Sequence, residues 1–99
     1  MALTGQNVIS AVTAENPRAV KVQTASTPVL PANANRNGLN LLNDSPNNIY
    51  FSLEGTAALD KDFVLYPGGS WNGIISNVLW TGLVTAIAAS ESNLLVAEV

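Results

Sequence analysis

Residues 36–50 constrain the fold more than any other part of this chain. Leu39 and Leu41 alternate with Asn40, and a second β-prone run begins at Ile49. Between the two runs lies a cluster of residues that tolerate the dihedral angles of tight turns, Asn43-Asp44-Ser45-Pro46-Asn47-Asn48. A strand, a turn and a second strand therefore follow one another directly, which indicates an all-β protein.

Similar short segments recur along the chain, with turn residues between them at roughly ten-residue spacing. We expect strands over 19–24, 39–43, 48–54, 63–66, 83–88 and 94–99, and a weakly alternating run over 71–78 that Gly73 interrupts. Flanking glycines and the threonine and valine content disfavour a helix over 78–89. The sequence predicts one antiparallel β-sandwich, jelly-roll-like, over residues 19–99.

Prolines and glycines refine this prediction. Residues 27–33 contain Pro28 and Pro31, and proline has no amide hydrogen to donate to a central ladder. We therefore expect this segment at a sheet edge or in a crossing between sheets. Pro67-Gly68-Gly69 matches a type II turn. Residues 1–18 form a separate extended N-terminal arm or short edge element in this interpretation, with a frayed terminus as the alternative.

The expected core consists of apolar residues at alternating strand positions. These are Val22, Leu39, Leu41, Ile49, Phe51, Phe63, Leu65, Val84, Ile87 and Leu95.

Composition limits how such a domain can be stabilised. The chain has 99 residues, of which 47% are hydrophobic and 11% charged, and it has neither cysteine nor histidine. A core this small is modest, and no disulfide can support it. Surplus apolar surface then favours burial against other subunits, so we expect a homo-oligomer. Side chains that we expect at an interface with other subunits or with another protein are Trp71, Trp80, Ala86, Ala88 and Arg36.

The same composition disfavours catalysis and several classes of partner. Without histidine or cysteine, the chain cannot build a Ser-His-Asp triad or a common zinc site. We expect no catalytic residues, no metal and no cofactor. The net charge is −3 and the four cations are scattered, so nucleic-acid binding is not expected. The longest apolar run, over 78–89, is too short to span a bilayer, so we expect no membrane partner.

Two groups of side chains offer alternatives to a purely structural protein. Asp60 and Asp62 flank Lys61 and could serve a calcium site or a glycosidase pair, although an exposed and dispensable loop tip is the simpler interpretation. Aromatic residues could form a flat platform that stacks on sugar rings, with Asn72 and Asn77 as hydrogen-bond donors, although tryptophan in a small domain more often fills a core or an interface. The platform candidates are Tyr50, Tyr66, Trp71 and Trp80.

An ordered set of motifs resembles small tailed-bacteriophage virion proteins. The set comprises Asn35-Arg36-x-Gly38-Leu39-x-Leu41-x-Asn43-x-Ser45, then Ile49-Tyr50, then Pro67-Gly68-Gly69-Ser70, and finally Thr85-Ala86-Ile87-Ala88-Ala89 before a short acidic turn and a valine-rich strand. The resemblance covers residues 35–99. Such proteins are capsid decoration (cement) proteins, head fibres or small tail and baseplate components, so the resemblance implies a structural part with a β-sandwich fold. Arg36 matches the motif's arginine, whose simplest role is to tie the strand entry to a carboxylate or carbonyl.

The resemblance and the composition together predict a non-enzymatic cement protein on the outer capsid surface. It would bridge and stabilise neighbouring capsid subunits, with the major capsid protein or another virion protein as partner, and a trimer would suit the three-fold positions of the shell. The alternative is a glycan-binding module or a fibre- or tail-associated adhesion component that uses Trp71 or Trp80. A cellular β-sandwich subunit is a third interpretation.

Overall fold

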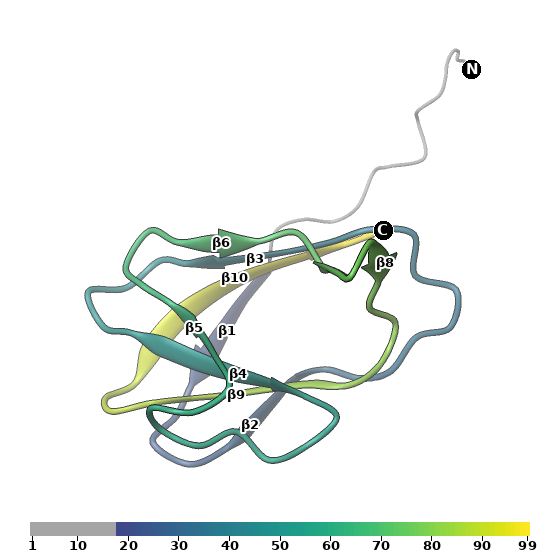
Figure 1. The fold of residues 1–99 in the computed structure, drawn as a ribbon. Helices are drawn as coiled ribbons and strands as arrows, with labels where there is room; N and C mark the ends of the chain where they lie inside the picture. Colours follow the sequence, from purple (N-terminus) through teal and green to yellow (C-terminus); the bar gives the residue numbers. More distant parts are fainter. Residues whose placement is uncertain (1–17) are drawn as a thin grey trace.

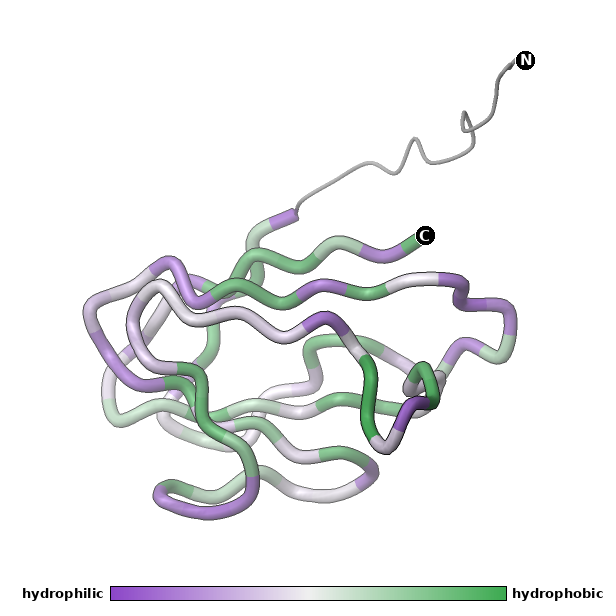
Figure 2. The backbone as a smooth tube through the Cα atoms, turned by 45° about the horizontal axis from the view of Figure 1, so that its top comes forward, coloured by the Kyte–Doolittle hydropathy of each residue, from purple (hydrophilic) through white to green (hydrophobic). Residues whose placement is uncertain are grey.

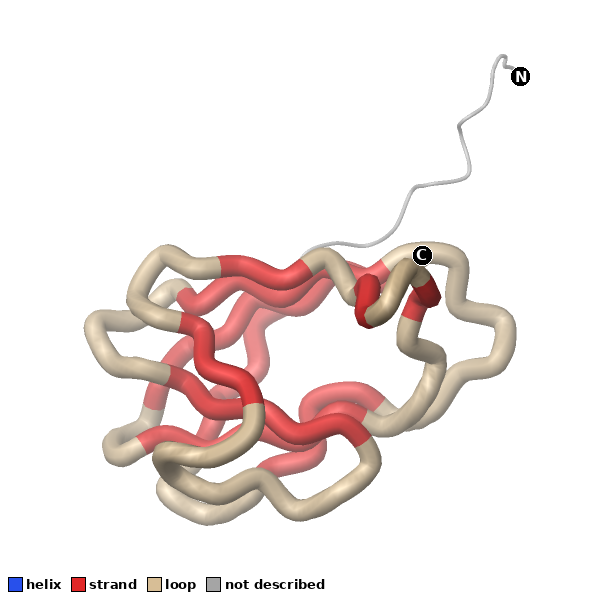
Figure 3. The backbone as a smooth tube through the Cα atoms, in the orientation of Figure 1, coloured by secondary structure: helices blue, strands red, loops and turns tan. Residues whose placement is uncertain are grey.

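The computed structural model describes residues 18–99, which form antiparallel β-sheets without a helix (Figures 1 and 3). The all-β prediction is confirmed, whereas the predicted arm over 1–18 lies, apart from Arg18, outside the described residues. In chain order the strands are β1 (Arg18–Val22), β2 (Thr27–Leu30), β3 (Leu39–Asn43), β4 (Ile49–Leu53), β5 (Phe63–Leu65), β6 (Ser70–Trp71), β7 (Ile74–Ile75), β8 (Val78–Leu79), β9 (Val84–Ala88) and β10 (Ser92–Glu98).

The strands form two four-stranded sheets and one hairpin. One sheet has the order β1-β10-β3-β6, the other has the order β2-β9-β4-β5, and β7 pairs with β8. The two sheets are separate layers in Figure 1, with β6, β3 and β10 in one and β4, β9 and β2 in the other. Figure 2 shows much of the apolar sequence along the strands and much of the polar sequence in the turns. The arrangement is sandwich-like.

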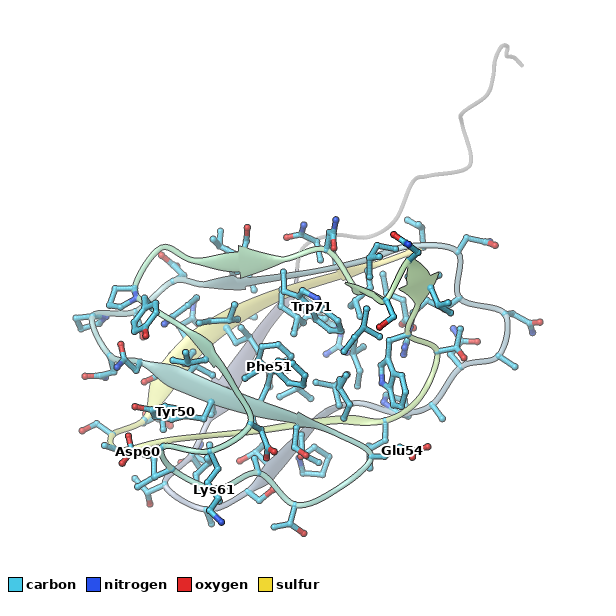
Figure 4. All side chains as sticks on the ribbon, viewed as in Figure 1. Tyr50, Phe51, Glu54, Asp60, Lys61 and Trp71 are labelled. Atoms are coloured by element: carbon cyan, nitrogen blue, oxygen red, sulfur yellow. The ribbon has the colours of Figure 1, made fainter. Side chains whose placement is uncertain are left out.

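Both sheets contribute alternate residues to a shared core. Figure 4 shows Phe51 of β4 and Trp71 of β6 directed toward each other between the layers. The buried cluster contains Val22, Val29, Leu30, Leu39, Leu41, Ile49, Phe51, Leu65, Val84, Ala86, Ala88, Leu94 and Val96. Seven of the ten expected core residues are therefore buried.

The other three expected core residues were assigned wrongly, for two reasons. Leu94 and Val96 face the core, so Leu95 between them lies on the opposite face and is only half-buried. The same alternation in β9 places Ile87 outside. Phe63 lies opposite the buried Phe51, but β5 is an edge strand and leaves 42% of Phe63 exposed.

The weakly alternating run over 71–78 is divided into three short strands. Gly73 has a φ of 84°, and a Cβ atom at this position would lie 2.8 Å from the Cβ of Leu39. Ser76 and Asn77 both have positive φ, at 51° and 66°. Two such residues between paired strands form the type I′ turn that suits a two-residue hairpin, which is β7–β8.

Two expectations about proline are confirmed. β2 is an edge strand, and its register shifts between Pro28 and Leu30. The 67–69 turn has proline at its second position and Gly68 at its third with a φ of 79°, and the amide of Gly69 donates to the carbonyl of Tyr66 at 2.7 Å. These features define a type II turn.

Candidate functional site

Arg36 is the most heavily bonded side chain of the motif region. Its side chain is fully buried, and Nε donates to Oε2 of Glu98 at 2.7 Å. Nη1 donates to the carbonyls of Trp80 (2.9 Å) and Gly82 (3.2 Å), and Nη2 donates to the carbonyl of Pro31 (2.8 Å). The guanidinium thus joins the nearby Pro31 to two segments that are distant in sequence, residues 80–82 and Glu98. This geometry matches the expected tie to a carboxylate and carbonyls, and it leaves the side chain no surface to offer a capsid.

Glu98 is the acidic partner in this network. Partial burial by itself raises the pKa of the Glu98 carboxyl, but hydrogen bonds from Arg36 and from Asn33 (3.2 Å) outweigh burial and lower it. The positive charges of Arg36 and Arg18 act in the same direction. Glu98 is therefore held as a carboxylate at the end of β10, where it stabilises the guanidinium.

Asn43 forms a second buried polar centre. The sequence placed it at the end of a strand, in the turn cluster and in the motif set, but did not predict its burial. Its Nδ2 donates to the carbonyls of Asn47 (2.6 Å) and Leu65 (2.8 Å), and its Oδ1 accepts from the hydroxyl of Ser45 (2.7 Å). The side chain fixes the β3–β4 turn and fastens it to β5. The available signal was local, because asparagine and serine two positions apart favour such turns, but the contact with Leu65 is not local.

The alanines proposed for an interface occupy the core instead. Ala86 and Ala88 are fully buried between the sheets of their own chain. In register, they lie opposite Phe51 and Ile49 of β4, whose large side chains need small neighbours. The side chains of Ala86 and Ala88 therefore have no exposed surface in this structure for a contact with another chain.

The two tryptophans are half-buried and lie in different surroundings. The Trp71 ring is tilted against the ring of Phe51, with ring centroids 5.0 Å apart. Phe51 in turn stacks on Phe63, with ring centroids 5.1 Å apart. Trp80 packs against the core, and its Nε1 donates to the carbonyl of Leu83 at 3.1 Å. Only Trp71 belongs to a row of aromatic rings, and this row connects the two layers.

Exposed apolar side chains concentrate beside this row. We define the β5–β8 edge as residues 63–79, which run from β5 through β6 to the β7–β8 hairpin on the near side of Figure 1. Phe63 (42%), Ile74 (42%) and Val78 (63%) are exposed there, and Trp71 and Leu79 are half-buried. These apolar side chains lie in a segment that also exposes Ser70, Asn72, Ser76 and Asn77, and β5 and β6 end their sheets along it.

The opposite edge of the molecule has a different chemistry. β1 and β2 end the two sheets there and lie on the far side of Figure 1. Arg18 and Lys21 lie on β1, and Pro28 lies on β2. Charged residues and proline are the usual devices that keep a free strand edge from pairing. The β5–β8 edge carries neither within its strands, although short strands limit pairing there as well.

The four aromatic residues suggested as a sugar platform do not gather at one place. Tyr50 and Tyr66 line a cavity of about 240 Å³ on the outer face of the second sheet, and neither tryptophan lines that cavity. Asp60 and Asp62 are exposed, as expected, and lie at the cavity's rim.

Comparisons with known proteins, and searches for a metal site and a membrane-spanning helix, assign no function to these residues. No protein-family model, curated protein sequence or solved structure matches the chain. Within residues 18–99, no three acidic, histidine or cysteine side chains gather in a way that could hold a metal ion. The described part of the chain also has no helix long and apolar enough to cross a membrane.

Proposed function

We propose that this chain is a non-enzymatic structural protein of a virion, of the decoration type that binds the outer capsid surface and stabilises neighbouring subunits. In this proposal it self-associates through the β5–β8 edge. The motif resemblance over residues 35–99 supplies the class of protein. The exposure of Phe63, Ile74 and Val78 on one edge is the observation that carries the proposal.

The strand order supports the finer description of the fold as a jelly-roll-like sandwich. One sheet contains β1, β3, β6 and β10, and the other contains β2, β4, β5 and β9. Strands that follow one another in sequence therefore often lie in different layers. Two four-stranded sheets related in this way are the architecture of many viral capsid domains and also of lectins. The fold alone therefore does not choose between a structural role and a binding role.

The chemistry of the β5–β8 edge favours contact with another protein. Protein interfaces have cores enriched in aromatic and other apolar side chains and depleted in charge. Phe63, Trp71, Ile74 and Val78 provide such a surface, and the type II turn and the β7–β8 hairpin fix the backbone around it. Charged residues make up only 11% of the chain, so burial against another protein is the main way to remove this apolar surface from water.

A glycan-binding role for the tryptophans has less support. Trp71 packs against Phe51, and the indole N–H groups of Trp71 and Trp80 are bonded to the carbonyls of Ile74 and Leu83. Their ring edges are thus engaged within the chain, and both rings are half-buried.

Multi-angle light scattering on the purified chain tests the proposed self-association. We expect a trimer of the 10.3 kDa chain, and we expect Val78→Asp to dissociate it because a charge would enter an apolar contact. Ala89→Asp is the matched control, since it places the same acid at an exposed position outside the edge. A stable wild-type monomer would contradict self-association, and a dimer would contradict the trimer.

The virion assignment needs a separate experiment. An electron density map of purified particles that carry the chain should contain the two-layer domain on the outer capsid surface. Density only at the tail or inside the head would contradict the decoration role. Particles produced after deletion of the gene should lack this density and should disassemble at a lower temperature.

A further inference from the structure

We infer that the cavity between β4, β5 and residues 60–62 binds a neutral saccharide. The side chains that carry this inference are those of Asn48, Tyr50, Asp60, Asp62 and Tyr66, all of which line the cavity. The inference goes beyond the proposed virion role. Val64 and Tyr66 of the cavity also belong to the β5–β8 edge, whereas Trp71, Ile74 and Val78 do not line the cavity.

Two tyrosines reach this cavity because of strand alternation. Ile49 and Phe51 of β4 face the core, so Tyr50 between them faces outward, and its register partner Val64 on β5 does the same. Tyr66 follows two residues after Val64 and is 62% exposed. Aromatic faces of this kind pack against the apolar face of a sugar ring.

Polar groups beside the rings are already ordered by hydrogen bonds. The hydroxyl of Tyr50 donates to Oδ1 of Asp60 at 2.9 Å, and Nδ2 of Asn48 lies 3.4 Å from the same hydroxyl (Figure 4 labels Tyr50 and Asp60). A carboxylate has several acceptor sites, so Asp60 can also accept from a ligand hydroxyl. Vicinal hydroxyls of a sugar match a row of such acceptors and donors.

The charges at the rim disfavour anionic ligands. The two carboxylates repel an anion, and Lys61 on the same rim weakens the attraction that they exert on a cation. Within residues 18–99, Lys61 forms no ion pair, so its ammonium group can donate to a ligand oxygen. An uncharged ligand with many hydroxyl groups satisfies this mixture best.

The backbone of the rim has an unusual conformation. Asp60 and Asp62 have φ values of 59° and 60°, in the left-handed region that side chains other than glycine seldom adopt. Such conformations concentrate at ligand-binding segments because the surrounding structure must enforce them. Here the hydrogen bond from Tyr50 holds Asp60 in place.

The size and lining of the cavity restrict the ligand further. Its volume of about 240 Å³ lies below the ~300–1,000 Å³ of sites for drug-sized molecules, so one sugar ring or the end of a chain is the suitable size. A second cavity of about 540 Å³, beside Pro28 and Glu54, has no aromatic lining. The smaller cavity is therefore the better saccharide site.

Nuclear magnetic resonance titration of the full chain tests this inference. D-glucose, D-galactose, D-mannose and N-acetyl-D-glucosamine are added separately, with the anionic N-acetylneuraminic acid as a fifth probe. We expect at least one neutral sugar to shift the amide signals of residues 48–50 and 60–66 in a saturable manner. Tyr66→Ala should weaken that binding by about tenfold, because it removes an exposed stacking face.

Two further variants make the outcome decisive. Asp62→Asn should also weaken binding, since it removes one charged acceptor while asparagine still tolerates positive φ. Val78→Ala changes an exposed residue outside the cavity and should bind as the unmodified chain does. Absence of shifts with all four neutral sugars, binding of the anionic sugar alone, or an affinity that Tyr66→Ala leaves unchanged would each overturn the proposal.

Discussion

Arg36 shows how one side chain can hold several segments of a small fold. Its guanidinium satisfies the carbonyls of Pro31, Trp80 and Gly82 as well as the carboxylate of Glu98. The glycine–leucine strand entry that follows it in the motif is therefore anchored by contacts made far away in sequence. A pattern of residues can indicate such an arginine, but only the folded chain supplies its partners.

We predict that Arg36→Leu lowers the free energy of unfolding by about 3 kcal/mol, because buried carbonyls and Glu98 lose their donor. Urea denaturation followed by circular dichroism measures this change. Arg36→Lys is the matched control: it keeps the charge but lacks the planar fork, so it should restore only part of the loss. Equal stability of the leucine variant and the unmodified chain would mean that the network contributes nothing.

Glu98 should make stability depend on pH. Its pKa is lower in the folded chain than in the unfolded chain, so its contribution is complete above the ordinary glutamate pKa. The contribution is lost as pH falls from that value through the lowered pKa, because the unfolded state takes up the proton first. Thermal melts across this range should show a smaller decline for Glu98→Gln, which cannot titrate. An identical decline in both proteins would contradict this assignment.

Two turns were the features that the sequence located best, whereas the β7–β8 hairpin was not predicted. The β3–β4 turn and the 67–69 turn depend on local residue chemistry, and both lie where the pattern placed them. Strand β10 was harder because Leu94-Leu95-Val96 is an unbroken apolar run. Without alternation, the sequence does not tell which face meets the core, and Leu95 was assigned to the wrong one.

Two glycines allow the backbone and packing requirements of turns to be separated. Gly68 and Gly73 both have positive φ, but an added Cβ atom meets nothing within 4 Å at Gly68 and lies 2.8 Å from Leu39 at Gly73. We predict that Gly68→Ala costs about 1–2 kcal/mol from the left-handed conformation alone. Gly73→Ala should cost more, by roughly the 1–3 kcal/mol of an overpacked core. Equal losses in chemical denaturation would show that Leu39 moves freely aside.

The face assignment of β3 can be tested by neighbouring leucines. Leu41 is fully buried and Leu42 is half-buried on the opposite face. We predict that Leu41→Ala lowers the free energy of unfolding by roughly 2–5 kcal/mol because it leaves a cavity in the core. Leu42→Ala should cost much less in the same denaturation experiment. A larger loss for Leu42→Ala than for Leu41→Ala would mean that Leu42, and not Leu41, faces the core.

At the scale of the whole molecule, composition predicted surplus apolar surface but not its location. The alanines of β9 were natural candidates because small residues permit close contacts, yet their partners are the large side chains of β4. The tyrosine cavity was similarly out of reach. Alternation within β4 and β5 predicts that Tyr50 and Val64 face outward. The position of residues 60–62 beside them depends on the path of a loop, which the sequence pattern does not predict.

The number of copies in an assembly depends on how the β5–β8 edge is used. If the edge of one copy contacts the same edge of another, two-fold symmetry closes a dimer. A trimer requires the edge to contact a different surface of the next copy, so each chain must present two complementary surfaces. A charge on either surface would then dissociate the trimer, whereas only a charge on the edge would dissociate a dimer.

The placement of Trp71 also gives the chain an optical signal of its own. Trp71 lies on the β5–β8 edge beside Phe51, while the other tryptophan, Trp80, packs near Leu83. Indole emission moves to shorter wavelength when water is excluded from the ring. A Trp80→Phe variant would therefore report, through Trp71 alone and without any added label, the moment at which another molecule covers this edge.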